Sequence, residues 1–294
     1  MSDMRAALVT NEFVKSEKFE ELFAMLNEAA LKEGVELVRS SNAECFEKLG
    51  LSDYEEHSLG DYDFILFWDK DVRLAGELER IGYRVFNSAE AIAACDDKSI
   101  TYMRLKKAGV RQPLSFISPK KFHSDGLLPE AFLRSAGKKL SYPLVFKEVF
   151  GSFGDRVYLI NDEEELFERA RITGERAYML QEFIESSKGR DIRLQVVGDK
   201  VCAAMLRYND GDFRANITNG GSMKPYTPSE DEVKMALEAC RALNLSFAGV
   251  DILFGEDGPF LCEVNSNAHF KNLYDCTGIN AAEHIIAHLR EICS

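Results

Sequence analysis

Two carboxylates and an amide lie close together in the C-terminal part of the sequence. Asp251 and Glu263 flank the turn sequence Gly255-Glu256-Asp257-Gly258, and Asn265 follows two residues after the glutamate. If two antiparallel strands meet around a turn centred on Asp257, Asp251 lies opposite Glu263, and Asn265 shares the face of Glu263. Magnesium that holds substrate phosphates is the commonest cation on such oxygen ligands. The alternative is an acidic hairpin whose charges face solvent.

A glycine-containing loop lies between two apolar segments, residues 144–149 and 157–160. The loop reads Gly151-Ser152-Phe153-Gly154-Asp155. Its glycines would let backbone N–H groups approach a phosphate closely, although an ordinary hairpin turn would need them too. Lys147, on the strand before the loop, would neutralise bound phosphates, or it is simply a solvated charge at a strand edge. Together the two features favour a phosphate site.

Three arginines fall on or beside one predicted sheet in the segment that leads to the carboxylate pair. They are Arg193, Arg207 and Arg214. Arginines commonly do no more than face solvent. Close to a metal and a phosphate loop, however, three guanidinium groups make a site for anions, because each can pair with phosphate or carboxylate oxygens.

An α/β arrangement is expected to position these residues. The elements expected in the first block are a helix at 16–33, a strand at 64–68, a helix at 72–81 and a short strand at 83–86. This alternation is typical of a parallel sheet covered by helices. Ligands bind at the carboxyl ends of parallel strands, so Trp68-Asp69-Lys70 and Asn87-Ser88 are candidate substrate contacts, with turn and cap roles as the alternative.

The chain divides into three predicted domains. They are an N-terminal α/β domain at 1–94, a central lobe with the glycine loop at 95–182, and a C-terminal lobe with the carboxylate hairpin at 183–294. Asp96 or Asp97 would cap a helix that begins at Lys98, and Ser229 would cap a helix in the last lobe.

Composition limits the possible partners. The chain has 294 residues, 46% of them hydrophobic, and a formal charge of 36 − 49 = −13. This charge argues against a nucleic acid or an anionic membrane surface as the main partner. The seven cysteines are scattered and predict reduced thiols in the cytosol. The sequence lacks a signal region at its start and a long apolar run, so we expect a cytoplasmic protein.

The order of these motifs resembles that of the ATP-grasp fold. The motifs are Asp97-Lys98, Lys147 with the glycine loop, Gln181-Glu182-Phe183-Ile184, Gly189-Arg190-Asp191-Ile192-Arg193, Gly211-Asp212-Phe213-Arg214-Ala215-Asn216, Gly220-Gly221, Asp251 and Glu263-Val264-Asn265. Within that fold the chain is most similar to the RimK-type ligases, which add glutamate to protein or small-molecule acceptors. The resemblance covers essentially the whole chain, and it implies an ATP-grasp fold preceded by an N-terminal parallel α/β sheet domain.

The resemblance also implies a role for each matching residue. The ATP-binding set would be Lys98, Lys147, Gly151, Ser152, Phe153 and Gly154 at the phosphates, Gln181, Glu182, Phe183 and Ile184 at the adenine hinge, and Asp191 at the ribose. The catalytic set would be Arg207, Arg214 and Asn216, the last two also contacting the nucleotide. The substrate set would be Arg193, Arg207, Asn267 and His269. Asp251, Glu263 and Asn265 would bind two Mg²⁺ ions, for which Mn²⁺ can substitute.

The implied activity is ATP-dependent ligation of a carboxylate to an amine through an acyl phosphate. Glutamate or a related amino acid would be joined to a peptide, protein or metabolite, and the enzyme would be a homo-oligomer. The rival interpretations are an ATP-binding regulatory module without catalysis, and a ligase resembling glutathione synthetase or D-alanine–D-alanine ligase.

Two departures from the family pattern bear on this interpretation. After Glu263-Val264-Asn265 the family commonly continues with a small residue and Pro-Gly, whereas this chain reads Ser266-Asn267-Ala268-His269-Phe270. This loop is expected to border the acceptor, with His269 either contacting it or only packing. Arg156 and Glu148 also stand where relatives often have glycine and proline.

Overall fold

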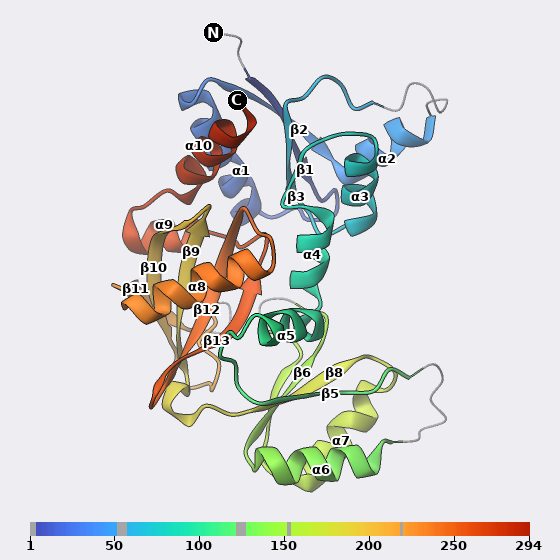
Figure 1. Cartoon of the computed structure of the whole chain (residues 1–294), viewed down its shortest axis with the longest axis vertical. Helices are drawn as coiled ribbons and strands as arrows, with labels where there is room; N and C mark the ends of the chain where they lie inside the picture. Colours follow the sequence, from blue (N-terminus) through green and yellow to red (C-terminus); the bar gives the residue numbers. More distant parts are fainter. Residues whose placement is uncertain (1–3, 52–57, 122–127, 152–153, 218–219) are drawn as a thin grey trace.

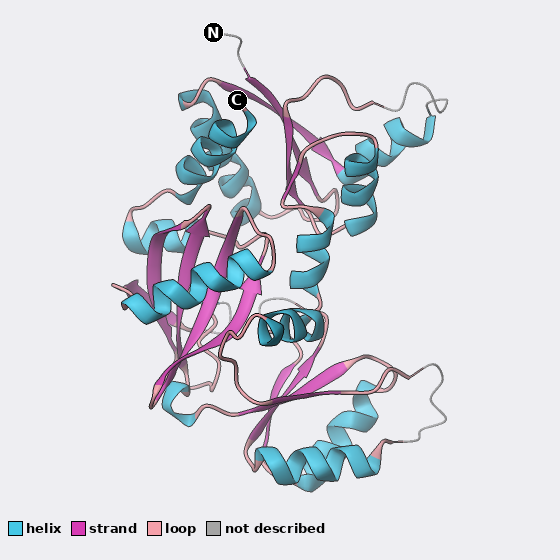
Figure 2. Ribbon diagram, in the orientation of Figure 1, coloured by secondary structure: helices cyan, strands magenta, loops and turns pink. Residues whose placement is uncertain are grey.

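Three β-sheets follow one another along the long axis of the molecule (Figure 1). The computed structural model describes residues 4–51, 58–121, 128–151, 154–217 and 220–294. One sheet is parallel and two are antiparallel, with helices packed on each (Figure 2). The predicted α/β class with a parallel N-terminal sheet is therefore confirmed. No helix in these described ranges is long and apolar enough to cross a membrane.

The N-terminal sheet is parallel, with the strand order β2-β1-β3-β4. Its elements are β1 (Met4–Thr10), α1 (Glu17–Lys32), β2 (Val35–Ser41), α2 (Asn42–Leu51), β3 (Phe64–Trp68), α3 (Val72–Arg80), β4 (Val85–Phe86) and α4 (Ala89–Asp96). Strand β3 is buried along its whole length, as a strand covered on both faces must be. The strand expected at 83–86 keeps only its last two residues.

The second sheet in chain order, called the central sheet here, lies at the lower end of the molecule in Figure 1. It is antiparallel, with the order β5-β8-β6-β7. Its elements are β5 (Ser115–Ile117), α6 (Glu130–Leu140), β6 (Leu144–Glu148), β7 (Val157–Ile160), α7 (Glu163–Thr173) and β8 (Tyr178–Glu182). Helix α5 (Lys98–Lys107) precedes them in the chain and packs through Leu105 in the core of the C-terminal sheet. Of the two predicted caps, Asp96 and Asp97, it is Asp97 that caps α5 by accepting from the backbone N–H groups of Ser99 and Ile100. Helices α6 and α7 cover the outer face of this sheet (Figure 1).

The C-terminal sheet is antiparallel, with the order β11-β10-β9-β12-β13. Its elements are the 3₁₀ turn η1 (Glu185–Ser187), β9 (Arg190–Val197), β10 (Lys200–Tyr208), β11 (Ser222–Pro225), α8 (Glu230–Ala242), β12 (Phe247–Gly255), β13 (Gly258–Asn265), α9 (Lys271–Thr277) and α10 (Ala281–Cys293). Ser229 and Glu232 form a complete capping box at the start of α8.

A β-bulge sets the register of the carboxylate hairpin. The turn between β12 and β13 has two residues and is not centred on Asp257, so regular pairing would place Asp251 opposite Cys262. The register shifts by one residue beside Asp251, which then pairs with Glu263. The predicted pairing is confirmed, but it depends on Cys262 as the extra residue of the bulge.

The last helix anchors the C-terminal sheet to the N-terminal one. Ile285, Ile286 and Leu289 of α10 share one buried core with Leu26 of α1 and Phe64 of β3. Full burial of each such side chain contributes about 1.5–3 kcal/mol. The two ends of the described chain therefore lie side by side (Figure 1).

Asn87 adds a polar link between the same two sheets. Its Nδ2 donates to the carbonyl oxygens of Phe247 at 2.9 Å and Ser266 at 2.8 Å, and its Oδ1 accepts from Ser246 N at 2.9 Å. The expectation that Asn87 contacts substrate is wrong, because all of these contacts fix the sheets to each other. Ser88 likewise caps α4.

Candidate active site

A first cavity lies between the central and C-terminal sheets. It gathers most of the residues expected around ATP: Lys98, Lys147, Gly154, Gln181, Glu182, Phe183, Ile184, Asp191, Arg207, Arg214, Asn216, Asp251 and Glu263. Ser152 and Phe153 lie outside the described residues. Strands from both lobes therefore bring together positions that are far apart in the sequence.

A second cavity adjoins the first and reaches the N-terminal sheet. Its walls hold Asn265 and the expected substrate residues Arg193, Asn267 and His269, together with Gly151, Trp68, Asp69 and Lys70. Arg207, Asn216 and Glu263 border both cavities. The two cavities therefore share these three side chains as part of their walls.

Two arginines and two carboxylates form a buried network on β9, β10 and β12. Arg193 binds Asp251 through two bonds of 2.7 Å, and Arg207 binds Asp191 at 2.7 and 2.8 Å. Arg207 also lies 3.0 Å from Asp251. Burial alone would raise the pKa of Asp251, but the charges of Arg193 and Arg207 outweigh it and hold that pKa below its usual range. Burial acts in the opposite sense on the second carboxylate and raises the pKa of Asp191, against the charge of Arg207. Two guanidinium groups thus face two carboxylates in this network.

Sequence reasoning placed these arginines at the site but missed their pairing. Arg193 and Asp251 are cross-strand partners, as are Arg207 and Asp191. If the register of β9 with β10 and β12 had been predicted, it would have placed each arginine opposite a carboxylate and so revealed the ion pairs.

The oxygen ligands fit a magnesium ion that is shared with a substrate. Glu263 is partly open to both cavities, and the amide of Asn265 has Nδ2 buried without a partner. Asp251 already accepts from two arginines, yet a carboxylate offers about four lone-pair sites, so it can share a cation. Among the described residues no group of three or more His, Cys, Asp or Glu side chains could hold a metal. The side-chain oxygens of Asp251, Glu263 and Asn265 are of the type that Mg²⁺ prefers, and Mg²⁺ commonly takes further ligands from substrate phosphates and water.

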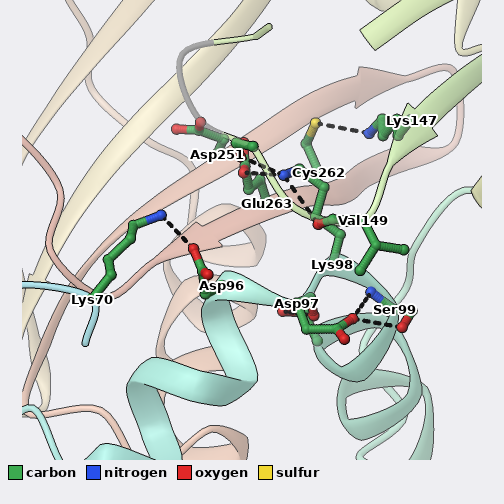
Figure 3. A network of polar contacts seen from close by, with 12 residues as sticks. Lys70, Asp96, Asp97, Lys98, Ser99, Lys147, Val149, Asp251, Cys262 and Glu263 are labelled. Carbon is green, nitrogen blue, oxygen red and sulfur yellow. Dashed lines mark hydrogen bonds and ion pairs between the residues drawn. The ribbon is translucent and has the colours of Figure 1, made fainter. Parts of the chain in front are cut away.

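Lys98, at the start of α5, and Lys147, on β6 of the central sheet, both lie beside the carboxylate hairpin (Figure 3). Lys98 Nζ donates to the carbonyl oxygen of Gly151 at 2.7 Å and lies 3.7 Å from Glu263. Lys147 is buried on β6, with Nζ 3.9 Å from the Sγ of Cys262. Burial raises the pKa of the Cys262 thiol to about 11, so the thiol stays protonated beside the lysine. Sequence reasoning did not single out Cys262 as a wall residue.

The glycine loop touches the opposite lobe through Arg214. Arg214 Nη1 donates to the carbonyl oxygen of Gly154 at 2.8 Å, and the same guanidinium binds Asp212 at 2.7 Å. This contact bridges the hairpin β6–β7 and the loop after β10. Arg214 therefore contacts the glycine loop and does not belong to the network of Arg193 and Arg207.

Arg156 and Glu148, the two residues beside the glycine loop that differ from the family pattern, form an ion pair with each other. Arg156 has φ of 62°, a left-handed conformation that explains why relatives often have glycine there. Its Nη1 lies 3.5 Å from Glu148, which also accepts from Arg176 at 2.7 Å. Two arginines thus compensate the buried Glu148.

The four expected hinge residues lie where β8 crosses between the lobes. Gln181 Nε2 donates to Ser115 Oγ at 2.9 Å, and Glu182 accepts from the backbone N–H of Leu114 at 3.1 Å. Phe183 packs edge-on against Phe213. The first two contacts join the end of β8 to β5 and the residue before it, and the third packs Phe183 against the loop after β10.

His269 both packs and lines the second cavity. Its Nε2 lies 2.9 Å from the carbonyl oxygen of Lys18, and its ring meets Phe19 edge-on. A carbonyl only accepts, so Nε2 carries the hydrogen and Nδ1 is an acceptor. Burial lowers the pKa of His269 from 6.5 to about 4. The imidazole is therefore neutral near pH 7.

His269→Gln is expected to flatten the loss of stability in acid. Between pH 6.5 and about 4 the unfolded state binds a proton at His269 that the folded state does not, so wild-type stability falls as pH falls. The gap in free energy of unfolding between wild type and variant should therefore narrow from pH 7 to pH 5 in urea titrations. The matched control is His284→Gln, at an exposed histidine. An unchanged gap for His269→Gln would contradict the buried neutral state.

Comparison with known proteins agrees with this geometry. Residues 95–289 match the RimK-like ATP-grasp domain. The chain is 30% identical over 289 residues to a probable alpha-L-glutamate ligase of Haemophilus influenzae, covering 90% of this chain and 91% of that protein. It is 34% identical over 219 residues to probable alpha-L-glutamate ligase 2 of Shewanella amazonensis, covering 74% and 70%.

A solved structure shares the fold along nearly the whole chain. The RimK domain ATP-grasp protein of Sphaerobacter thermophilus superposes with a TM-score of 0.70 at 22% identity, covering 97% of this chain and 99% of that one. At this identity the likeness shows the fold alone, whereas the domain match and the relatives show the family. The chain therefore belongs to the RimK-like ATP-grasp family of ATP-dependent carboxylate–amine ligases.

Proposed function

We propose that the enzyme activates a carboxylate as an acyl phosphate and joins it to the amino group of glutamate or a related amino acid. The observation that supports this most is the junction of the two cavities at Arg207, Asn216 and Glu263. A phosphate held in the first cavity and an amine held in the second would meet there. The relatives named as probable glutamate ligases suggest the amino acid.

Two bond exchanges make up the proposed reaction. A carboxylate oxygen attacks the γ-phosphorus of ATP, and the bond to the bridging oxygen breaks to release ADP. The ammonium group of the amino acid loses one proton to become the neutral amine. Its nitrogen then attacks the acyl carbon, the bond to the phosphate oxygen breaks, and the nitrogen gives up a second proton. Positioning and charge neutralisation suffice for both steps, so no serine or cysteine nucleophile is needed.

The charged side chains then have distinct proposed roles. Lys98, Lys147 and Arg214 would hold ATP phosphates, since all three stand at or beside the glycine loop. Arg207 would stabilise the oxyanion that forms during acyl transfer, because preorganised donors act strongly where water is excluded. Asp191 would contact the ribose of ATP while its carboxylate stays bound to Arg207.

Asp251, Glu263 and Asn265 are the proposed metal ligands, for two Mg²⁺ ions that Mn²⁺ can replace. When bound, the ions would neutralise phosphate charge during transfer. The hairpin supplies two carboxylates and an amide on one face, with Glu263 the ligand most open to the cavities.

The acceptor would be a peptide, a protein or a metabolite, and we propose a homo-oligomeric enzyme. The deciding experiment measures ADP formation with pairs of amino acids and carboxylic acids, followed by product masses. An amide product accompanied by one ADP would support the proposal. ATP binding without ADP formation from any pair would favour the regulatory module instead. The family match favours a RimK-like ligase over one resembling glutathione synthetase or D-alanine–D-alanine ligase.

Lys147→Ala is expected to weaken ATP binding by roughly 1 to 3 kcal/mol, the scale of a lost charge-assisted contact. The catalytic constant at saturating ATP should change much less. Calorimetric titration with a non-hydrolysable ATP analogue gives the affinity. Lys234→Ala, on the exposed face of α8, is the control. Unchanged affinity with a lower catalytic constant would move Lys147 from binding to chemistry.

A further inference from the structure

Unpaired polar atoms concentrate on the wall of the second cavity. Within the described chain, nine buried side-chain atoms lack a hydrogen-bond partner, and five of them belong to residues that line this cavity. These are Trp68 Nε1, Asp69 Oδ2, Asn265 Nδ2, Asn267 Oδ1 and His269 Nδ1. Buried polar groups are normally bonded, so this cluster indicates the place of a polar ligand.

Asp69 contributes the one carboxylate oxygen among these five unpaired atoms. The residue follows β3 directly and is only 6% exposed. Its Oδ1 accepts from Asn11 Nδ2 at 3.0 Å and from Lys70 N at 2.6 Å, whereas Oδ2 has no partner. Lys70 directs its Nζ to Asp96 at 2.6 Å (Figure 3). A buried carboxylate oxygen without a donor is costly, which favours a ligand that brings a positive charge and N–H groups.

Asn267 places a second acceptor beside Asp69. Its Nδ2 donates to the backbone oxygen of Asp69 at 2.7 Å, and that contact fixes the amide orientation and leaves Oδ1 as the unpaired acceptor. Because Asn267 lies two residues after Asn265, this acceptor adjoins the carboxylate hairpin.

The same cavity carries uncompensated positive charge. Lys18 lines it, and burial, with the nearby charge of Arg193, lowers the pKa of Lys18. No carboxylate of the described chain forms an ion pair with Lys18 in the structure, whereas Arg193 already holds Asp251. The cavity therefore offers a cation site at Asp69 and an anion site at Lys18, the pattern that a zwitterion complements.

We propose that Asp69 Oδ2 and Asn267 Oδ1 bind the ammonium group of an α-amino acid substrate, and that Lys18 binds its carboxylate. This assignment rests on the proposed ligase function and names the residues that select the amine. An ammonium has three donors and no acceptor, which suits two acceptors, one of them charged. The bound amine would lie next to Glu263 and Arg207 at the junction of the cavities.

Asp69→Asn tests the assignment. Asparagine keeps an oxygen for Asn11 and Lys70 but places an NH₂ group where the ammonium would bind. Affinities are measured with L-glutamate against glutarate, and with L-aspartate against succinate, in the presence of Mg²⁺ and a non-hydrolysable ATP analogue. Wild type should prefer at least one amino acid over its analogue without the amino group by about tenfold or more, and Asp69→Asn should lose that preference.

Two controls separate recognition from damage to the fold. Asp96→Asn removes a charge from the same wall, but one already paired with Lys70, and should keep the preference. Ligand-free Asp69→Asn should melt no lower than wild type, because an unpaired buried charge has been removed. If it does not fold, Asn267→Leu should still reduce the preference for the amino acid while leaving the affinity for the analogue unchanged.

Each outcome decides one of the two proposals. A preference that Asp69→Asn retains, or a wild type without one, overturns the role of Asp69. ADP formation by wild type with amino-acid pairs is measured in parallel. ADP formation without the Asp69 effect would leave the ligase function standing alone. An Asp69-dependent preference without ADP formation would leave an amino-acid site in a protein that does not ligate.

Discussion

Glu263→Gln is expected to lower turnover by roughly three orders of magnitude while leaving the fold intact, the scale of several kcal/mol of lost charge stabilisation. Glutamine keeps the shape and one oxygen of the side chain but removes the negative charge that would hold a cation. The side chain is 32% exposed and borders both cavities, and Lys98, its ion-pair partner at 3.7 Å, keeps its hydrogen bond to the carbonyl oxygen of Gly151. The measurements are ADP formation against Mg²⁺ concentration and the melting temperature.

The hairpin itself supplies the matched control. Glu256 stands in the turn between β12 and β13 and is exposed, so Glu256→Gln removes the same charge from the same hairpin away from the cavities. It should retain normal turnover. Normal turnover and an unchanged Mg²⁺ dependence in Glu263→Gln would exclude Glu263 from metal binding.

Arg207→Met is expected to damage both stability and chemistry. Arg207 is 4% exposed and is the arginine that binds Asp191, so its loss leaves that buried carboxylate uncompensated, at about 3–5 kcal/mol of unfolding free energy. Removal of a donor to the developing oxyanion should also lower the catalytic constant by about 10²–10³. Urea titration measures the first effect and saturating kinetics the second.

A double variant separates these two effects. Asp191→Asn combined with Arg207→Met removes both members of the ion pair, so most of the lost stability should return. The catalytic constant should stay low, because the oxyanion donor is still absent. If turnover returned together with stability, Arg207 would be a structural residue and the oxyanion would need another donor.

Local signals made most of the fold predictable from sequence. The apolar run of β3, the cap Asp97 and the capping box that begins at Ser229 each specify an element without reference to distant residues. Because these signals act within a few positions, the helices and strands that carry the site could be placed correctly. The motif order then supplied the family.

The features that could not be predicted from the sequence depend on contacts between residues far apart in the chain. The bulge at Cys262 compensates a turn of unexpected length, and no local pattern marks it. The bonds of Arg193 and Arg207 to carboxylates depend on the register of three strands. Asn87 was expected at the substrate because it ends a strand, yet it meets Phe247 and Ser266, which are far away in the chain.

The junction of the two cavities has a consequence for inhibitor design. Because Arg207, Asn216 and Glu263 line both spaces, a nucleotide analogue and an amino-acid analogue bound there would contact the same three side chains. Joining them through a short phosphinate or phosphonate would make the second contact intramolecular. At an effective concentration in the millimolar range, such a tethered molecule gains avidity from geometry alone. Weak fragments found separately for each space are therefore natural starting points.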